Sequence, residues 1–424
     1  MNKILIITYY WPPGGGAGVQ RWLKFASYLP ESGWEPVILT VDPKYAVYPV
    51  TDQSLENEVP ENLKVYRTPA TDFYRFFYRD KAGVPSAGFA NKKDDSVAGK
   101  ISRFIRGNLF IPDPRIGWNK YAFKKACEVI EDEKINIVVT TSPPHSTQLT
   151  GLRLKKRYPA LKWIADLRDP WTDIYYYKLF YPTAIAKKID LCLEKKVLRT
   201  ADRIITVSPA LKKLFARKIQ SSEDKIEVIT NGYDISDFIN VNPETPEKLT
   251  ITYTGTMSEA YPVDGLLEVL HKMQNSGTDF LFRFVGTVND KIRKRIIMKA
   301  GDKHTEFISH VSHPEAIKYM AASTVLLLVI PHYPHNRLII TGKLFEYIAS
   351  EKPVLCLGPV DGDAAEIIKN CRAGVTAAYD DTRAIEEFFN NLPLIREQID
   401  RSAAEQYSRS NLAKRFASVL DSYS

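Results

Sequence analysis

Short apolar runs alternate with longer segments of helical periodicity along most of the chain. Continuous apolar runs such as INIVV (135–139) are typical of strands that are buried on both faces of a parallel sheet. The alternation predicts an α/β protein with parallel sheets. In the first half, the predicted strands are 3–8, 35–41, 135–140, 163–166, 203–207 and 226–229, and the predicted helices include 18–29 and 119–133.

A second series of the same kind follows the polar, Pro-containing segment VNPETPEKLT (241–250). Its predicted strands are 249–253, 280–285, 325–329, 354–357 and 374–376, and its predicted helices are 263–275, 314–322, 342–349 and 363–370. We therefore expect two doubly wound domains, 1–240 and 241–395, joined near 235–248. The tail 396–424 is expected to form helices that pack back on the first domain. In such sheets, ligands bind beyond the carboxyl ends of the strands.

The composition is that of an ordinary globular protein, with 44% hydrophobic and 25% charged residues among 424. No apolar run approaches the ~18–20 residues that a bilayer span needs. The opening MNKILIITYY continues with WPP instead of a small-residue cleavage site, which argues against a signal peptide. The four cysteines show no CxxC spacing, so no zinc cluster or disulfide framework is implied. We therefore expect a cytoplasmic location.

The net charge of +8 lies entirely in the first half of the chain. Residues 1–240 hold 37 Lys and Arg against 27 Asp and Glu, whereas residues 241–424 hold 21 against 23. A basic half can bind anionic lipid, nucleic acid or a phosphorylated substrate. No zinc-finger, homeodomain or RNP pattern is present, so we expect no nucleic-acid partner.

The segment 72–118 fits the α/β pattern poorly. It contains FYRFFYRDK and ISRFIRGNLF, in which aromatic and basic residues alternate. Such an insertion either rests on an anionic membrane surface or binds an anionic acceptor. The alternative is a solvated helical excursion that packs its aromatic rings inward, and the sequence leaves both open.

A glycine cluster, YYWPPGGGAGVQRW (9–22), follows the first predicted strand. Glycines between a strand and a helix allow backbone N–H groups to approach an anionic ligand. The nicotinamide fingerprint GxGxxG fails on spacing, because its third glycine is absent from every register. We expect Gly15 and Gly16 to contact a ligand, and a tight turn without a ligand is the alternative.

Seven motifs then occur in order over nearly the whole chain: YYWPPGGGAGVQR, TTSPPHS, ADLRDPW, ITVSPALKKLF, VITNGYD, YTGTMSE and TGKLFEYIASEKPVL. Together they resemble glycosyltransferase family 4, of the GT-B type. The resemblance implies an α/β fold of two Rossmann-like doubly wound domains that face each other across a cleft. It also implies transfer of a sugar from a nucleotide-activated donor with retention at the anomeric carbon, without an essential metal.

The segment TGKLFEYIASEKPVL (341–355) carries the most chemistry. Gly342 is expected to open a helix whose N–H groups and dipole attract a diphosphate, and Lys343 adds a positive charge. Glu346 lies on the same helical face, where its carboxylate suits two ribose hydroxyls. In the resembling family it is the second residue of a Glu-x7-Glu pair, whose first position is Leu338 here. Arg337 is expected to contact phosphate instead. A surface ion pair between Lys343 and Glu346 is the alternative.

The segment YTGTMSEAYPVDG (253–265) is a second departure from the family, which often has Arg and Lys here. Gly255 and Thr256 are expected to bind phosphate through backbone N–H groups and the hydroxyl, and an ordinary strand-end turn is the alternative. The complete set of expected donor-binding residues is Gly15, Gly16, Gly255, Thr256, Arg337, Gly342, Lys343, Leu344 and Glu346.

The first domain contributes polar residues after two strands. His145 is expected to hydrogen-bond a sugar hydroxyl or share a proton with the acceptor. Asp166 is expected to stabilise oxocarbenium-like charge or to orient the acceptor hydroxyl. Arg168 and Asp169 are expected to contact the acceptor or to brace the loop. His145, Asp166 and Lys343 are therefore the predicted catalytic residues.

No metal site is predicted. The DxD spelling of Asp361-Gly362-Asp363 resembles metal-dependent transferases of another fold, but Asp363 is placed to be a helix N-cap. Hard divalent cations require several oxygen ligands, and we expect no third acid to be placed where it could complete such a site.

The sequence thus predicts a glycosyltransferase that moves a sugar from a nucleoside-diphosphate sugar to a glycan or lipid-linked acceptor, in cell-surface polysaccharide synthesis. It is expected to need no cofactor. The expected location is the cytoplasm, and peripheral contact with the inner face of the membrane is a further expectation. Two alternatives remain: a sugar-nucleotide epimerase of the same fold and a non-catalytic sugar-nucleotide-binding protein.

Overall fold

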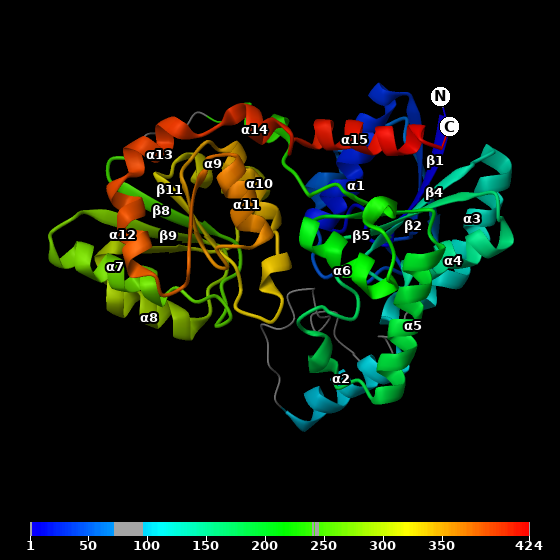
Figure 1. The fold of residues 1–424 in the computed structure, drawn as a ribbon, viewed down its shortest axis with the longest axis horizontal. Helices are drawn as coiled ribbons and strands as arrows, with labels where there is room; N and C mark the ends of the chain where they lie inside the picture. Colours follow the sequence, from blue (N-terminus) through cyan, green and yellow to red (C-terminus); the bar gives the residue numbers. More distant parts are fainter. Residues whose placement is uncertain (1, 72–95, 240, 242–245, 424) are drawn as a thin grey trace. The chain divides into compact units, whose positions relative to one another are not determined.

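The computed structural model describes residues 2–71, 96–239, 241 and 246–423. The chain divides into two compact units (Figure 1). The first comprises Met1–Thr230 and Arg409–Ser424, and the second comprises Asn231–Ser408. Each unit is an α/β body built on one sheet.

The first unit contains a seven-stranded, all-parallel sheet with strand order β3-β2-β1-β4-β5-β6-β7. Its strands are β1 (Asn2–Ile7), β2 (Trp34–Val41), β3 (Lys64–Thr68), β4 (Ile137–Ser142), β5 (Lys162–Leu167), β6 (Arg203–Thr206) and β7 (Ile226–Val228). Its helices are α1 (Ala17–Tyr28), α2 (Val97–Leu109), α3 (Asn119–Glu133), α4 (Thr147–Arg157), α5 (Ala184–Thr200), α6 (Pro209–Ile219) and α15 (Arg409–Asp421). Apolar cores lie on both faces of the sheet, one including side chains of α1 and α15 and the other side chains of α3 and α4.

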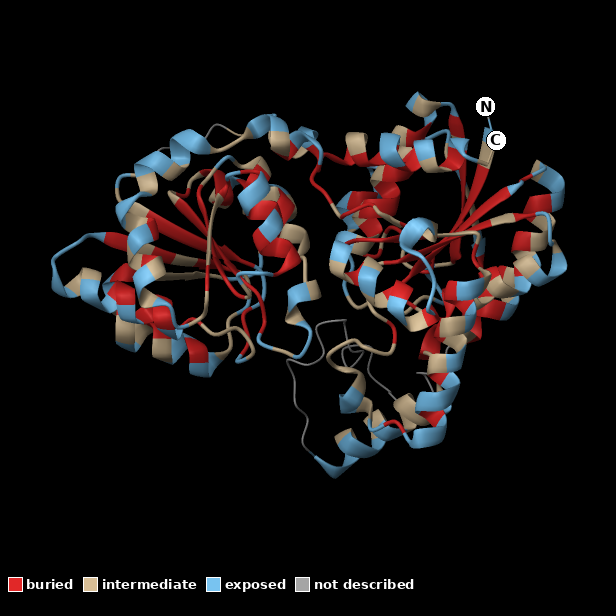
Figure 2. Cartoon of the chain, in the orientation of Figure 1, coloured by how far each residue is buried: buried red, intermediate tan, exposed pale blue. Residues whose placement is uncertain are grey.

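The second unit repeats the design with six parallel strands in the order β10-β9-β8-β11-β12-β13. Its strands are β8 (Leu249–Thr254), β9 (Phe280–Val285), β10 (Thr305–Ile308), β11 (Val325–Val329), β12 (Val354–Leu357) and β13 (Gly374–Ala377). Its helices are α7 (Asp264–Asn275), α8 (Asp290–Ala300), α9 (His313–Ala321), α10 (Gly342–Ala349), α11 (Asp363–Asn370), α12 (Thr382–Asn390), α13 (Leu392–Gln398) and α14 (Arg401–Glu405). In both units the buried positions concentrate on the strands (Figure 2). The predicted class, two Rossmann-like α/β units, is confirmed.

Two strands are absent from the prediction, β3 and β10. Both lie at an edge of their sheets. The segment KVYRT of β3 is mostly exposed or half-buried, and all four residues of β10 are half-buried. Edge strands are covered by fewer neighbours, so they need no continuous apolar run and give a weak sequence signal.

The division between the units falls after Thr230, ten residues before the predicted boundary. The difference has a physical cause, because Tyr233 is buried in the core of the second unit and its amide donates to the carbonyl of Tyr407 at 3.2 Å. The tail is also divided. Helices α13 and α14 belong to the second unit, and the chain returns to the first unit only at Arg409.

Helix α15 is part of the first unit's core. The ring of Phe416 stacks on Phe25 of α1 with centroids 5.8 Å apart, and it meets the edge of Trp22 at 5.6 Å. Asp421 accepts a hydrogen bond from the indole of Trp34 at 2.9 Å. The last residues of the chain therefore close one face of the first sheet.

The predicted insertion 72–118 is described only in part. The segment FYRFFYRDK lies outside the described residues, whereas ISRFIRGNLF lies in α2 and just after it. Helix α2 has no buried residue, and Val97 and Leu109 are 75% and 72% exposed. Ile101 and Phe104 are also exposed. The alternative, in which the aromatic rings of the insertion pack inward, mostly concerns residues outside the described ranges. Among the described residues, no helix combines the length and the apolar character needed to cross a bilayer.

Replacing Phe416 with Ala is expected to lower the free energy of unfolding of the first unit by about 3–5 kcal/mol, because it leaves a cavity between α1 and α15. Chemical denaturation followed by tryptophan fluorescence measures the change. Lys414→Ala, at an exposed position of the same helix, is the matched control. Equal stability of the two variants would contradict the packing of α15 on the first unit.

Candidate functional site

The strand order of the first sheet reverses between β1 and β4. At such a switch point the loops after the two strands separate and leave room for a ligand beyond the carboxyl ends. Here the two loops are the glycine cluster and SPPHS. The topology thus brings together two motifs that lie more than one hundred residues apart.

Within the glycine cluster, only part of the backbone is open. Gly16 is the N-cap of α1, has φ of 97°, and a side chain there would meet nothing within 4 Å. The amide of Gly15, by contrast, donates to the carbonyl of Val50 at 2.9 Å. At Gly18, an added Cβ would lie 2.1 Å from the guanidinium of Arg168. Gly16 therefore keeps its predicted access, whereas Gly15 and Gly18 serve the packing of the loop.

His145 lies in the loop after β4 with its imidazole stacked on Trp171, at 5.0 Å between centroids and 10° between planes. Both ring nitrogens are buried, and neither has a hydrogen-bond partner among the described residues. Burial, followed by the charges of Arg168, Lys218 and Arg106, lowers the pKa of His145 to about 3. The imidazole is therefore neutral near pH 7 and can donate one hydrogen bond and accept another.

The loop that carries His145 is fixed by hydrogen bonds with the side chains of Asp113 and Asn119. Asp113 accepts hydrogen bonds from the amide of Ser146 at 2.7 Å and from its hydroxyl at 2.8 Å. The side-chain amide of Asn119 donates to the carbonyl of Ser146 at 2.7 Å. These contacts fix the backbone next to His145, and the sequence analysis did not identify either residue.

Asp166 occupies a position different from the one expected. It is fully buried and accepts hydrogen bonds from Thr141 at 2.7 Å, from the indole of Trp22 at 2.9 Å and from Arg21 at 3.3 Å. Its carboxylate links β5 to β4 and to α1, and it is not open to a reacting sugar. The prediction that Asp166 acts in catalysis is therefore corrected to a structural role.

Arg168 and Asp169, the other two charged residues of ADLRDPW, lie directly after the end of β5. Arg168 donates from Nε to the carbonyl of Ser142 at 3.1 Å and from Nη2 to that of Pro143 at 3.4 Å, which braces the loop after β4. Asp169 is half-buried. Burial raises the pKa of Asp169, and the charge of Arg168 partly opposes that shift.

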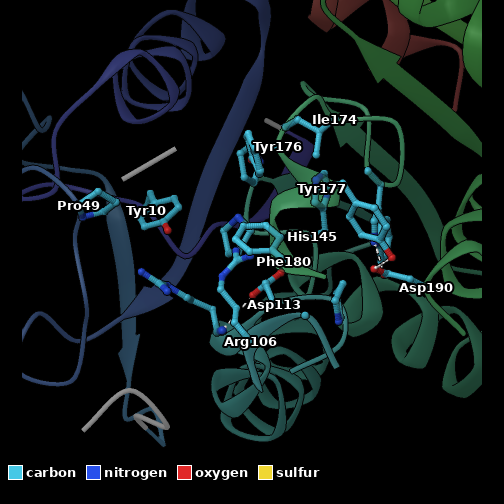
Figure 3. Close-up of a pocket in the computed structure, with 16 residues that line it drawn as sticks. Tyr10, Pro49, Arg106, Asp113, His145, Ile174, Tyr176, Tyr177, Phe180 and Asp190 are labelled. Atoms are coloured by element: carbon cyan, nitrogen blue, oxygen red, sulfur yellow. Dashed lines mark hydrogen bonds between the residues drawn. The ribbon is translucent and has the colours of Figure 1, made fainter. Parts of the chain in front are cut away.

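A pocket of about 140 Å³ opens beside His145 in the first unit (Figure 3). It is lined by Tyr10, Pro49, Arg106, Gly107, Pro112, Asp113, Arg115, Pro143, Pro144, His145, Trp171, Ile174, Tyr176, Tyr177, Phe180 and Asp190. Of these, only His145 was predicted as a site residue. Arg106, Gly107, Pro112, Asp113 and Arg115 lie in the insertion 72–118, which was expected either to rest on a membrane surface or to bind an anionic acceptor. The run IYYYKLFY (174–181), unusually rich in aromatic residues, was the available signal.

In the second unit, the strand order reverses between β8 and β11, and the residues predicted to hold a diphosphate gather after β8 and at the start of α10. The Nζ of Lys343 donates to the carbonyl of Thr254 at 2.5 Å and lies 4.0 Å from the ring centroid of Tyr253. A Cβ added to Gly255, whose φ is 103°, would lie 3.1 Å from the same Nζ. Burial lowers the pKa of Lys343 to about 7, and the charge of Glu346 opposes the shift. Gly255 and Lys343 thus meet, although 88 residues separate them.

The start of α10 also contains a hydroxyl that lacks a hydrogen-bond partner among the described residues. Thr341 is its N-cap without a capping hydrogen bond, and its buried hydroxyl has no partner among the described residues. Leu344 corrects the prediction of a donor contact, because its side chain is fully buried in the core and its amide donates to the carbonyl of Thr341 at 3.2 Å. Glu346 pairs with His313 at 3.0 Å. The alternative interpretation, a surface ion pair between Glu346 and Lys343, is not formed among the described residues.

The remaining predicted donor residues lie at the surface. Thr256 is exposed, and its carbonyl accepts a hydrogen bond from the hydroxyl of Tyr253 at 2.8 Å. Arg337, in a short 3-10 helix (Asn336–Leu338), pairs with Asp361 at 3.0 Å. Asp363 is the first residue of α11 and Gly362 its N-cap, which corrects the predicted capping role.

No group of three or more His, Cys, Asp or Glu side chains in the described parts of the chain could hold a metal ion. This statement covers the Asp361-Gly362-Asp363 segment of the second unit.

Comparison with known proteins bears on the family. Residues 80–237 match the model of the family described as Glycosyltransferase Family 4. The resemblance to this family is confirmed. No curated protein matches the chain.

Solved structures of low identity share the fold over the full length. Anabaena HepE in complex with UDP is 13% identical with a TM-score of 0.63, and each chain is covered to 100%. Sucrose-phosphate synthase from Thermosynechococcus elongatus is 14% identical with a TM-score of 0.61, covering 100% of this chain and 99% of that one. A Listeria monocytogenes structure described as a UDP-N-acetylglucosamine 2-epimerase is 11% identical with a TM-score of 0.59, with coverages of 99% and 96%. The chain thus has the fold of GT-B glycosyltransferases.

Replacing His145 with Phe is expected to make the protein less sensitive to acid. The unfolded state binds a proton near pH 6.5 and the native state only near pH 3, so wild-type stability falls as the pH drops through this window. At pH 5 the loss is about 1–2 kcal/mol. Urea unfolding between pH 7 and 4 measures the difference, with the exposed His271→Gln as control. Parallel pH profiles for wild type and H145F would refute the neutral, buried imidazole.

Proposed function

We propose that this protein is a retaining glycosyltransferase that uses a nucleoside-diphosphate sugar. It transfers the sugar to a glycan or lipid-linked acceptor in cell-surface polysaccharide synthesis and requires neither a metal nor a cofactor. The observation that carries the proposal is the meeting of Lys343, Gly255 and the open start of α10 at the switch point of the second sheet.

Each of these features suits a diphosphate. The N-terminus of α10 supplies backbone N–H groups and the positive end of a dipole. The hydroxyl of Thr341 is buried without a partner in the described structure, which is the state expected of a group that a ligand completes. Gly255 lets the backbone after β8 approach closely, because no side chain intervenes.

Lys343 supplies the charge that a leaving nucleoside diphosphate needs. Without ligand, its Nζ is held against the Thr254 carbonyl and the Tyr253 ring, and its pKa is about 7. An arriving diphosphate raises this pKa by Coulomb attraction and keeps the ammonium charged. The interaction strengthens as negative charge develops on the leaving group, which is how such a contact accelerates transfer.

Glu346 is placed to bind the nucleoside. One carboxylate oxygen is paired with His313 at 3.0 Å, which fixes the carboxylate and leaves the other oxygen for a ribose hydroxyl. Because Leu338 replaces the acid that the family places near the sugar, Thr256 and Arg337 are the polar groups proposed to contact the donor on that side. In the first unit, the neutral His145 is proposed to hydrogen-bond a sugar hydroxyl.

The similar structures suggest which sugar donor to test first. Anabaena HepE was solved with UDP and with UDP-glucose, so we propose a uridine diphosphate sugar as the first donor to test. An epimerase remains the second candidate, because a structure described as one shares the fold. Release of an epimerised nucleotide sugar in the absence of acceptor would favour the epimerase. Sugar transfer only when an acceptor is present favours the transferase.

Location at the inner face of the membrane is part of the proposal. Helix α2 exposes Val97, Ile101, Phe104 and Leu109. It also carries Lys100, Arg103 and Arg106. Apolar and basic side chains on one helix suit a surface of anionic lipid, where the apolar groups enter the headgroup region and the cations remain among phosphates.

Replacing Lys343 with Met is expected to lower turnover about 100- to 1,000-fold, because a charge-assisted contact to a developing anion is lost. Wild-type affinity for UDP should fall as the pH rises above about 7, where the unliganded lysine loses its proton, and K343M should lack this pH dependence. Isothermal titration calorimetry between pH 7 and 9 and transfer assays measure both effects.

Lys369→Met, at an exposed position of α11, is the matched control and should behave as wild type. The proposed diphosphate site would be wrong if K343M bound UDP with unchanged affinity and pH profile. A wild-type protein that bound no nucleoside diphosphate at all would overturn the proposed function itself.

A further inference from the structure

The pocket beside His145 is completed by elements outside the α/β core of the first unit. One wall is the last turn of α2, and another is the short 3-10 helix η7 (Tyr177–Phe180). The two segments are in close contact, since a Cβ added to Gly107 would lie 2.3 Å from the carbonyl oxygen of Phe180. The side chain of Asn108 donates to the carbonyl of Tyr181 at 3.1 Å and accepts from the amide of Thr183 at 2.8 Å. The inserted helix is therefore a fixed part of the pocket.

The acidic groups of the pocket are already used by the protein. Asp190 accepts hydrogen bonds from the indole of Trp171 at 2.6 Å and from the hydroxyl of Tyr177 at 2.9 Å, as the dashed lines in Figure 3 show. Asp113 is occupied by Ser146. These carboxylates orient the lining, and each of their oxygens already accepts a hydrogen bond from the protein.

His145 and Arg106 are two polar residues of the lining that can bind a ligand. The buried nitrogens of His145 lack partners among the described residues, and a neutral imidazole pairs well with a hydroxyl, which both donates and accepts. The guanidinium of Arg106 lies 3.6 Å from the ring centroid of Phe180 and has no carboxylate partner in the described structure. A guanidinium held flat on a ring still presents its N–H groups at its edge, where they bind an oxyanion.

The rest of the lining is aromatic. Tyr10, Tyr176 and Phe180 surround His145 in the close-up view (Figure 3). A mainly apolar cavity with a few placed polar groups is the usual form of a small-molecule site. Aromatic faces suit the C–H faces of a sugar ring, while its hydroxyls need partners such as His145.

We infer that this pocket binds the acceptor and that the acceptor is a saccharide carrying a phosphate ester. A hydroxyl of the sugar pairs with His145, and the phosphate pairs with Arg106. The inference rests on the proposed transferase function and extends it to the chemical class of the acceptor. The phosphate can belong to a free sugar phosphate or to a lipid headgroup. Exposed Phe104 and Leu109 lie on the same helix as Arg106 and would contact the lipid in the second case.

Binding to the full-length protein tests this inference, with glucose 1-phosphate and methyl α-glucoside as the charged and neutral probes. Wild type is expected to bind glucose 1-phosphate at least about tenfold more tightly, since a charge-assisted contact is gained. Arg106→Gln should abolish that preference. Arg103→Gln, one turn away on α2 and not among the described lining residues, is the matched control and should retain it.

A third variant and a third probe sharpen the result. His145→Phe preserves a ring on Trp171 but removes both nitrogens, so it should weaken both sugars by a similar factor. Decyl diphosphate glucose distinguishes the sources. Binding much tighter than that of glucose 1-phosphate, and reduced by Phe104→Ser, identifies a lipid headgroup, whereas equal binding identifies a free sugar phosphate.

UDP binding, measured on the same samples, separates this inference from the proposed function. A wild-type protein that binds UDP but shows no preference for the phosphorylated sugar overturns the inference and leaves the transferase proposal standing. A preference that survives in R106Q also overturns it. A wild-type protein that does not bind UDP but still prefers the phosphorylated sugar refutes the transferase proposal. It supports only the assignment of a phosphorylated sugar to the pocket.

Discussion

The buried carboxylate of Asp166 is the interaction on which the first unit's ligand-facing surface depends. It joins three segments that carry motifs, because Arg21 and Trp22 follow the glycine cluster, Thr141 precedes SPPHS, and Asp166 itself ends β5. A carboxylate at zero exposure is stable only when its charge and lone pairs are fully matched. Removing one partner of such a buried pair typically costs ~3–5 kcal/mol. The three loops are thus held in register by one interior charge.

In the second unit, the charge at the switch point of the sheet is positive and has fewer partners. Its half-buried charge is the ammonium of Lys343, which has a carbonyl and an aromatic face as neighbours but no direct carboxylate contact within the described residues. Burial with incomplete compensation lowers the pKa of the lysine, and an anion that reaches the ammonium raises that pKa again. In the first unit the charge of Asp166 is matched by hydrogen-bond donors. In the second unit we propose that a ligand matches the charge of Lys343.

The sequence predicted those parts of the fold that depend on continuous apolar runs. The bounds of β9, β11, β12 and α3 agree with the structure residue for residue, because a strand buried on both faces, or a helix with one apolar stripe, leaves little freedom in the pattern. Edge strands such as β3 leave more freedom and were missed. Gly255 and Lys343 were each expected to bind phosphate, and the structure brings them together at the switch point of the second sheet.

The sequence could not reveal which strand-end side chains are already paired. Asp166 and Asp169 look alike in ADLRDPW, yet the first is enclosed by donors from α1 and β4 and the second is not. The pocket beside His145 was also beyond prediction, because Arg106, Trp171 and Asp190 come from an insertion, a loop and a helix with no common motif. Residues that are brought together only by the fold produce no periodic pattern in the sequence.

The return of the chain to the first unit at Arg409 has a consequence for biosynthesis. The second unit, residues 231–408, is in effect an insertion within the first. The core that α1 and α15 share on one face of the first sheet cannot be completed until α15 has left the ribosome, after the entire second unit. The N-terminal half, although synthesised first, is therefore the last to complete its core, and a nascent chain stopped short of residue 409 would present an uncovered apolar surface around Phe25 to chaperones.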